Sequence, residues 1–196
     1  MAAVGERENE IKLAVASAEE GRRRLECAGF RLHKGRVFES NTLFDTPDGR
    51  LRQARRLLRI REVNGASLLT YKGAPEPGRH KSREELELRF EPAGVLARIF
   101  ERLGYVVSFR YEKYRSEYVQ PGEPGVATLD ETPIGVFFEL EGDGAWIDAA
   151  AVRLGFGQRE YILASYASLY LDYCRASGAA PGEGMLFPGS SATTPA

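Results

Sequence analysis

The sequence has few of the residues that build zinc centres or disulfide frameworks. Its 196 residues include two cysteines, Cys27 and Cys174, and two histidines, His33 and His80. The cysteines match neither a disulfide framework nor a zinc-ligand spacing, so a reducing cytosol is the simplest setting. The histidines also lack a metal-ligand spacing, and we expect both to be surface residues.

Long apolar runs and an excess of one charge are also missing. No stretch of 18 apolar residues occurs and no apolar signal region opens the chain, which favours a soluble cytoplasmic protein without membrane contact. Lys and Arg number 27 against 28 Asp and Glu, a net charge of -1. A nucleic-acid surface requires a basic excess, so we expect no nucleic-acid partner. The locally basic run from Arg50 to Arg61 alternates with Leu58 and Ile60, which would bury half of it.

The composition is sufficient for one domain with a real core. Hydrophobic residues make up 43% of the chain, and we assign residues 1–176 to a single domain. From Ser177 onward Gly, Pro, Ala and Ser dominate, so we expect residues 177–196 to form a disordered tail. The sequence offers no partner for the apolar patch Met185-Leu186-Phe187 in this tail.

The pattern of turns and apolar positions predicts mainly strands with about four helices between them. The turn at Asn64-Gly65 is typical of a hairpin, and many hairpins imply a largely antiparallel sheet. Phe30 to Phe44 reads as two short strands, broken at Lys34-Gly35. The lone Trp146 is expected to pack in the core. The expected helices are 17–28 with a capping box at Ser17 and Glu20, 92–103, 148–154 with Asp148 as N-cap, and 164–175.

Charged residues fall on every second position near the N-terminus. In a strand, Glu8, Glu10 and Lys12 would point to one face. Two carboxylates and an ammonium within about 14 Å of strand could hold a hard cation beside a polyanion. Taken alone, the pattern is equally typical of a solvated strand face.

The same alternation recurs along the chain. The charged residues that share a face within their strands are Arg59 and Arg61; Arg83, Glu85, Glu87 and Arg89; Lys113, Arg115 and Glu117; and Glu139 and Glu141, with Lys72 and Asp130 at the ends of two more strands. An ordinary antiparallel sheet with a wet polar face would also alternate. Here the polar positions are almost all ionisable, and the apolar faces are broad enough to need helices as covers. These features favour a closed barrel with its charges inside.

Charges buried in a barrel need partners, because an uncompensated buried charge costs several kcal/mol, on the order of 3–5 when one partner is removed. Arginine and lysine match phosphate oxygens, and glutamate oxygens match Mg²⁺ or Mn²⁺. A metal-bound polyphosphate would satisfy both sets of charges.

The order of these segments resembles the CYTH family, the triphosphate tunnel metalloenzymes, over roughly residues 6–175. This family includes thiamine triphosphatases, inorganic triphosphatases and class IV adenylyl cyclases. The segments that carry the resemblance are Glu8-x-Glu10-x-Lys12, residues 43–52 (LFDTPDGRLR), 58–61 (LRIR), 70–73 (TYKG), 83–87 (REELE), 113–115 (KYR), Leu129-Asp130, 139–141 (ELE), and Ser165-Tyr166 with Leu169. The resemblance implies an α+β fold, mainly antiparallel, in which an eight-stranded closed barrel forms a triphosphate tunnel with helices packed outside.

The resemblance also implies roles for individual residues. The candidates for binding phosphate are Lys12, Arg52, Arg59, Arg61, Lys72, Lys113 and Arg115. The candidates for holding Mg²⁺ or Mn²⁺ are Glu8, Glu10, Glu139 and Glu141. The candidates for groups at the reaction centre are Lys12, Glu85, Glu87 and Asp130. Arg52 is explained equally well as a surface residue, and Ala164 stands where some members carry a lysine before the Ser-Tyr pair.

The implied activity is metal-dependent hydrolysis of the terminal phosphate of a triphosphate, namely inorganic triphosphate, thiamine triphosphate or a nucleoside triphosphate. A class IV adenylyl cyclase, which would form cyclic AMP and pyrophosphate from ATP, is the first alternative. A non-catalytic polyphosphate-binding module is the second. We expect a monomer or homodimer whose partner is a small triphosphate.

Overall fold

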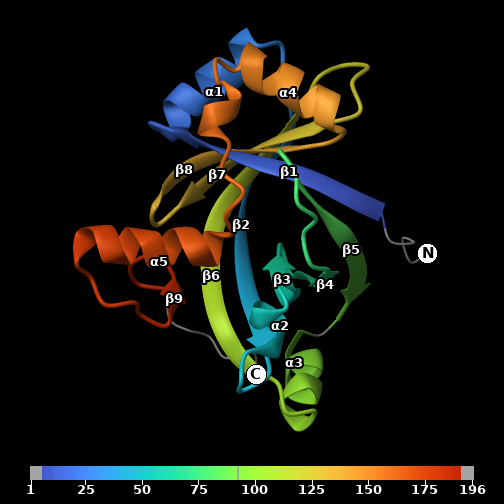
Figure 1. Ribbon diagram of the computed structural model, residues 1–196, viewed down its shortest axis with the longest axis vertical. Coiled ribbons are helices and arrows are strands. Elements are labelled where there is room, and N and C mark those ends of the chain that lie inside the picture. Colours follow the sequence, from blue (N-terminus) through green and yellow to red (C-terminus); the bar gives the residue numbers. More distant parts are fainter. Residues whose placement is uncertain (1–5, 92, 191–196) are drawn as a thin grey trace.

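The eight-stranded barrel expected from the sequence is confirmed by the computed structural model, which describes residues 6–91 and 93–190 (Figure 1). The strands are β1 (Glu6–Val15), β2 (Arg31–Asp45), β3 (Leu57–Val63), β4 (Ala66–Lys72), β5 (Lys81–Phe90), β6 (Val106–Val119), β7 (Val126–Thr132), β8 (Gly135–Glu141) and β9 (Gly184–Met185). The helices are α1 (Ala18–Cys27), α2 (Arg50–Gln53), α3 (Ala93–Arg102), α4 (Gly144–Arg153) and α5 (Tyr166–Ser177), with a 3-10 turn at Gln158–Glu160. No helix in the described ranges is long and apolar enough to span a bilayer.

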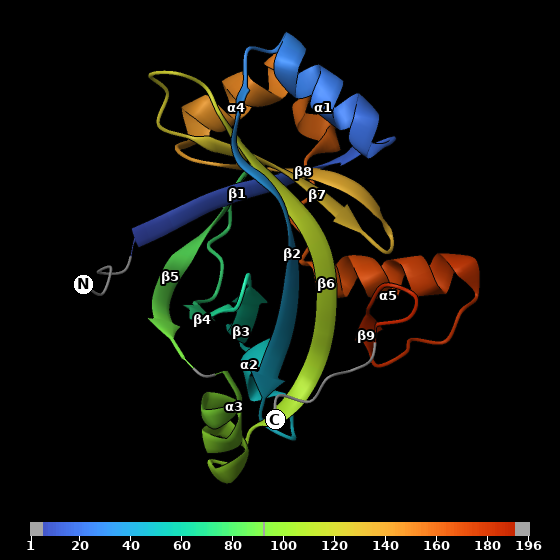
Figure 2. The same cartoon turned by 180° about the vertical axis from the view of Figure 1, so that it is seen from behind.

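Antiparallel pairing closes the sheet on itself. The strand order is β2-β3-β4-β5-β1-β8-β7-β6, and β2 pairs with β6 to complete the circle. β2 and β6 are the longest strands, with 15 and 14 residues, and they run side by side along the molecule (Figures 1 and 2). β9 adds a short parallel strand to β6. Closure removes the unpaired edges that an open sheet would expose.

Helices cover the barrel in three places. α1 and α4 lie together over β1, β7 and β8 at one end, where Ile11, Leu13 and Phe138 are fully buried beneath them. α3 packs at the opposite end on Phe44 and Ile60. α5 and β9 flank β6 around Tyr111. The buried apolar residues of β1, β3 and β8 therefore face the helices, whereas Leu86 and Leu88 of β5 are exposed; the alternate residues of these strands face the interior.

The strand expected to break at Lys34-Gly35 is instead continuous. β2 spans Arg31–Asp45, with register shifts between Leu32 and Lys34 and between Lys34 and Val37 against β6. A bulge absorbs irregular residues without ending a strand. Pairing with the long strand β6 on both sides of Gly35 therefore keeps β2 continuous.

The helix expected to begin at Asp148 begins earlier. Asp143 is the N-cap of α4, and its side chain accepts a hydrogen bond of 2.8 Å from the backbone N–H of Trp146. This start lets Trp146 pack in the core against Phe30, as expected, with 5% of its surface exposed. Burial of the Trp146 side chain therefore explains why Asp143, and not Asp148, is the N-cap of α4.

The tail expected to be disordered is partly ordered. Ser177 ends α5, and Gly184–Met185 then pairs with β6 as β9, leaving Met185 fully buried. The segment is rich in Gly, Pro, Ala and Ser on average, but it contains the short apolar patch Met185-Leu186-Phe187. This patch lies against the edge of β6. Residues 191–196 lie outside the described residues.

The contact between Gly125 and Trp146 predicts a specific sensitivity. A Cβ atom at Gly125 would lie 2.3 Å from the indole ring, whereas Gly35 has no atom within 4 Å of such a Cβ. We expect Gly125→Ala to lower the free energy of unfolding by about 1–3 kcal/mol through overpacking. Thermal or urea unfolding would measure it, with Gly35→Ala as the control. Equal stability of the two variants would contradict the assigned packing.

Candidate functional site

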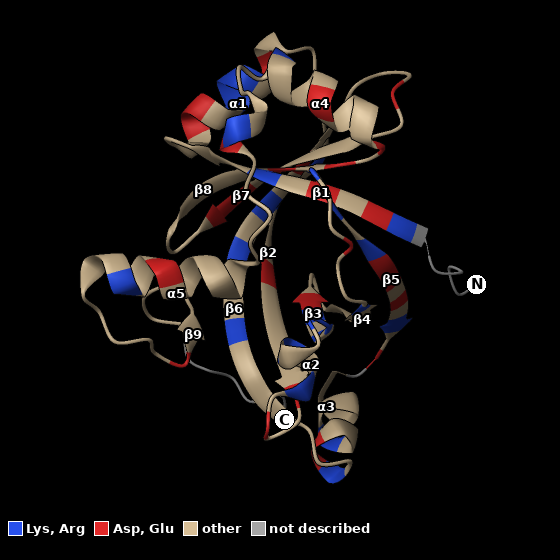
Figure 3. Ribbon diagram, in the orientation of Figure 1, with Lys and Arg blue, Asp and Glu red and all other residues tan. Residues whose placement is uncertain are grey.

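The inner face of the barrel is lined by charges of both signs. Figure 3 shows both blue and red bands along β1 and β5, and blue bands on β6. Six predicted site residues are at least nine-tenths buried there: Glu10, Lys12, Arg59, Lys72, Lys113 and Asp130. Glu8, Arg61, Glu85, Arg115 and Glu139 are partly buried beside them. The strand alternation therefore brings eleven predicted residues to one interior.

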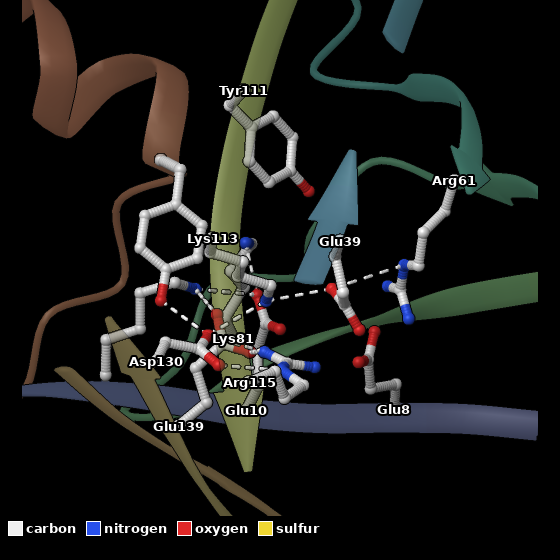
Figure 4. A network of polar contacts seen from close by, with 12 residues as sticks. Glu8, Glu10, Glu39, Arg61, Lys81, Tyr111, Lys113, Arg115, Asp130 and Glu139 are labelled. Atoms are coloured by element: carbon white, nitrogen blue, oxygen red, sulfur yellow. Dashed lines mark hydrogen bonds and ion pairs between the residues drawn. The ribbon is translucent and has the colours of Figure 1, made fainter. Parts of the chain in front are cut away.

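Asp130, on β7, lies at the centre of one group (Figure 4). Its fully buried carboxylate accepts from Lys113 Nζ at 2.8 Å, from Arg115 Nε at 2.7 Å and from the Tyr166 hydroxyl at 2.7 Å. Arg115 also pairs with Glu139. Although burial opposes it, the carboxylates of Asp130 and Glu139 raise the pKa of Arg115 well above its usual range. Asp130 therefore orients two cations and one tyrosine.

Glu10, on β1, is the centre of a second group. Lys81 pairs directly with its carboxylate, and the nitrogens of Lys12 and Arg83 lie 3.6 Å from it. Burial alone would raise its pKa, but the ammonium groups of Lys12 and Lys72 hold the pKa of Glu10 well below its usual range. Lys12 Nζ also lies 3.1 Å from Glu139, which joins this group to the first.

Lys81 responds to the same environment in the opposite way. Burial outweighs the attraction of Glu10, and it lowers the pKa of Lys81 to about 8. A buried lysine is held in its charged form by nearby anions, because they offset the cost of desolvation. The interior therefore favours added negative charge near this ammonium group.

Two carboxylates share Lys72 at the β1–β5 side. Lys72 pairs with Glu8, and its nitrogen lies 2.9 Å from Glu85. Burial and a hydrogen bond with Glu8 raise the pKa of Glu85 to about 8. Burial acts on Glu8 too, but Lys72 lowers the pKa of Glu8. Of the two carboxylates, Glu85 therefore holds a proton more readily than Glu8.

Arg59 is held by neutral groups. Its guanidinium donates to the Thr70 hydroxyl at 3.0 Å and to the Tyr111 hydroxyl at 3.1 Å, and it lies 3.6 Å from Glu87. Glu87 itself is exposed at the rim, where it accepts from Thr70 at 2.8 Å. Arg59 is therefore fixed in place by two hydroxyl groups, and the carboxylate of Glu87 is its ion-pair partner.

Several buried polar atoms in the described interior have no hydrogen-bond partner. They are the Nε atoms of Arg59, Arg61 and Arg83, Glu39 Oε2, and both amide atoms of Asn41. A buried donor without a partner costs about 1–3 kcal/mol. Each of the three guanidinium groups therefore has one N–H that could donate to a further acceptor.

The sequence reasoning missed several members of this interior. They are Glu39, Asn41, Thr70, Lys81, Tyr111 and Tyr166. Glu39 pairs with Arg61 and Lys113 at 3.8 and 3.7 Å, and these cations, with Arg115, bring the pKa of Glu39 to about 2 despite its burial. Strand alternation could have found Lys81 and Tyr111, which share parity with Arg83 and Lys113. Tyr166 enters from a helix, for which alternation carries no signal.

One predicted phosphate-binding residue and one predicted metal ligand do not lie in the buried interior. Arg52 is exposed on α2, and no described ion pair includes it. Glu141 is exposed at the rim of the barrel. The structure therefore places Arg52 at the surface position that was its alternative.

His33 is exposed as expected, but His80 is not a surface residue. The side chain of His80 is 12% exposed, and its Nε2 lies 2.9 Å from Asp148, whose Oδ1 also accepts from Tyr161 at 3.0 Å. The imidazole packs over Gly144, where a Cβ would lie 2.9 Å from the ring. The absence of a side chain at Gly144 makes room for the histidine.

The predicted metal ligands lie on neighbouring strands. Glu10 faces Glu141 and Lys12 faces Glu139 across the β1–β8 pair. Although Glu141 is exposed at the rim, partial desolvation of its carboxyl and the carboxylate of Glu8 raise the pKa of Glu141 to about 7. Carboxylate oxygens that crowd one another in this way are the donors that hard divalent cations prefer.

The donor chemistry therefore fits Mg²⁺ or Mn²⁺, while the geometry is not preformed. Within the described ranges, no group of three or more Asp, Glu, His or Cys side chains is gathered as a metal site. Glu10 and Glu139 are engaged by lysine and arginine instead.

The structure is a closed barrel of eight antiparallel strands whose buried interior carries charges of both signs. The CYTH domain model matches residues 6–152, and the chain belongs to the CYTH family. A relative from Methanocaldococcus jannaschii, named "Putative adenylate cyclase", is 31% identical over 135 residues, which is 68% of this chain and 75% of the relative.

Solved structures share the fold. The PH1012 protein of Pyrococcus horikoshii has a TM-score of 0.70 at 25% identity, covering 81% of this chain and 96% of that one. HpAC1 of Hippeastrum, described as a "putative adenylyl cyclase" with a dominant triphosphatase activity, has a TM-score of 0.60 at 19% identity, covering 89% and 97%.

The raised pKa values of Glu85 and Glu141 predict a pH-dependent stability. Both exceed the ordinary value of 4.5, so between about pH 5 and pH 8 the folded state binds more protons than the unfolded state. The free energy of unfolding of the metal-free protein should fall as pH rises through this window. Urea unfolding across the window would measure the slope.

The matched variants are Glu85→Gln, which should flatten that slope, and Glu62→Gln, an exposed position that should leave it unchanged. An unaltered slope in Glu85→Gln would show that Glu85 ionises normally.

Proposed function

We propose that this protein is a divalent-metal-dependent triphosphatase that hydrolyses the terminal phosphate of a triphosphate bound inside the barrel. The observation that supports this most strongly is the set of three buried guanidinium Nε donors without hydrogen-bond partners, on Arg59, Arg61 and Arg83, whose groups lie 3.6 to 3.8 Å from a carboxylate. Planar guanidinium groups match phosphate oxygens in shape and charge. A short polyanion along the tunnel axis would meet all three.

The basic residues would bind the substrate in proposed roles that follow from their positions. Arg59 and Arg61, on β3, lie on one wall, and Lys113 and Arg115, on β6, lie on another, held by Asp130. Lys12 and Lys72 come from β1 and β4. Cations fixed before the substrate arrives stabilise charge on a transferring phosphoryl group without reorganising.

The metal would be held by the carboxylates Glu8, Glu10, Glu139 and Glu141. When bound, Mg²⁺ or Mn²⁺ would supply Lewis-acid polarisation of the phosphoryl oxygens and an acidified water. In the structure Glu10 and Glu139 neutralise Lys12. A triphosphate would offer Lys12 phosphate oxygens instead, which would leave these carboxylates available to a cation. Substrate and metal would therefore bind together. The phosphate would replace the carboxylates as the partner of the lysine, and the metal would replace the lysine as the partner of the carboxylates.

Other residues would support the reaction centre. The raised pKa of Glu85 gives it a proton near neutral pH, which suits a hydrogen bond to a phosphate oxygen, and Glu87 holds Thr70 at the rim. Lys12 would contact the substrate directly, and Asp130 would act by orienting its two cations. The carboxylates favour an enzyme over a simple polyphosphate-binding module, because a binder needs only the basic set.

Adenylyl cyclase activity is the second candidate, since a relative carries that name. In that reaction the 3′-hydroxyl of ATP attacks the α-phosphorus and releases pyrophosphate. It requires a base pocket and an aligned ribose in addition to the tunnel. The triphosphatase activity stated for HpAC1 supports the simpler hydrolysis.

A substrate panel distinguishes these reactions. Tripolyphosphate, thiamine triphosphate and ATP would each be incubated with Mg²⁺ or Mn²⁺, and released phosphate scored against cyclic AMP with pyrophosphate. We expect orthophosphate release that ceases in excess EDTA. Full turnover in EDTA would overturn the metal dependence, and cyclic AMP as the main product would favour the cyclase.

Arg59 offers the sharpest single test of the binding role. Arg59→Ala should weaken tripolyphosphate binding by about 2–5 kcal/mol, because it removes a buried charged partner. Isothermal calorimetry with metal present would give the Kd. Arg102→Ala, at an exposed position on α3, is the matched control and should bind as the unmodified chain does. Equal Kd values for the two variants would remove Arg59 from the site.

A further inference from the structure

The segment after α5 returns along the outside of β6, and we call residues 178–190 the C-terminal strap (Figures 1 and 2). Its strand β9 pairs in parallel with Arg110 and Tyr111. β7 pairs with β6 only from Tyr114 onward, so this part of β6 would otherwise expose an edge. The strap therefore completes the wall of the barrel at a place that the eight main strands leave unpaired.

The strap approaches β6 closely because of one glycine. A Cβ atom at Gly184 would lie 2.1 Å from the carbonyl oxygen of Arg110. A larger residue at this position would push β9 away from β6. The position is therefore suited to backbone pairing and tolerates no side chain.

A buried carboxylate holds the end of the strap. Glu112 is 6% exposed, and its Oε2 accepts from the Phe187 backbone N–H at 3.0 Å and from the Ser190 hydroxyl at 2.7 Å. The ion pairs of the described residues include none to Glu112. The Phe187 ring also lies 5.2 Å from that of Tyr114. The hydrogen bonds of this carboxylate thus come from the strap.

Met185 lies directly behind two tyrosines of the tunnel. It is fully buried in one cluster with Tyr111, Tyr166 and Phe137. The rings of Tyr111 and Tyr166 are 5.8 Å apart. The Tyr111 hydroxyl accepts from Arg59, and the Tyr166 hydroxyl donates to Asp130. One methionine on the outside therefore supports the two rings whose hydroxyls contact the charged interior.

The Tyr166 ring also contacts two lysines. Lys12 Nζ and Lys113 Nζ each lie 5.2 Å from the centre of the Tyr166 ring. A cation over an aromatic face is attracted by it, and more so when it is shielded from water. A shift of the Tyr166 ring would therefore move the preferred positions of two phosphate-binding candidates as well as its bond to Asp130.

We propose that the C-terminal strap is a positioning element of the substrate tunnel, acting through Met185 on Tyr111 and Tyr166 and through them on Arg59 and Asp130. This inference rests on the proposed triphosphate function and adds to it a segment beyond the matched residues 6–152. Loss of the Met185 side chain would leave a gap behind both rings, and cores collapse only partly into such gaps. Arg59 would then lose the fixed hydroxyl that orients it.

The test measures tripolyphosphate affinity in the full chain with Mg²⁺ present. Met185→Ala should raise the Kd about tenfold, since misplacing a positioned group costs one to two powers of ten. Met185→Leu, which conserves volume, should restore most of the affinity. Gly184→Val should act like Met185→Ala by displacing β9. Glu183→Gln, at an exposed strap position, should bind as the unmodified chain does.

A double-mutant cycle separates positioning from simple loss of stability. If Met185 acts through Tyr111 on Arg59, Met185→Ala should weaken binding much less in an Arg59→Ala background, because coupled residues are not additive. The same factor in both backgrounds, or an unchanged Kd in Met185→Ala, would overturn the proposal. Should Met185→Ala fail to fold, Glu112→Gln, which weakens only the end of the strap, takes its place in the same cycle.

The unmodified chain separates this proposal from the proposed function. If it binds no tripolyphosphate, the triphosphate function is overturned and this inference with it. If it binds, but truncation after Ser177 binds as well as truncation after Ser190, the strap has no positioning role while the function stands. Truncation after Ser190 keeps every strap contact described above.

Discussion

Mutual neutralisation of charges that are shut away from water is the interaction on which this structure depends. Asp130 is the clearest case, since one fully buried carboxylate accepts from a lysine, an arginine and a tyrosine. A closed barrel can hold so many ionised groups only if each has a partner of opposite sign or a hydrogen-bond donor. The strand register supplies those partners by setting carboxylates opposite or beside cations on neighbouring strands, as with Lys12 and Glu139. The strand register therefore determines both the shape of the barrel and the pairing of the charges inside it.

The interior of the barrel was largely predictable because strands have a period of two. Once Ile11 and Leu13 are assigned to the helix-covered side, Glu10 and Lys12 must face inward. The same reasoning places Arg59 and Lys113 correctly. It requires only that the sheet close, and closure followed from the density of ionisable residues on one face.

What the sequence could not predict depends on contacts between distant segments. Tyr166 reaches Asp130 from a helix 36 residues later, and neither position carries a periodic signal of this contact. The choice between Asp143 and Asp148 as helix cap was decided by the burial of Trp146, a tertiary effect on a local preference. The order in residues 178–190 comes from a few apolar side chains against the edge of β6, which composition averages conceal.

The pairing of β2 with β6 has a consequence for how the chain reaches this state. Its partners are separated by 61 to 88 residues along the sequence, and those of β1 and β8 by 121 to 131, whereas the β3–β4 and β7–β8 hairpins join neighbours. Local hairpins form quickly, and distant pairs wait for the entropy of a long loop to be overcome. The barrel is complete only when β2 meets β6 and β1 meets β8. The same distant pairings that align the ion partners therefore also exclude water from them, so closure of the barrel and desolvation of its charges are linked.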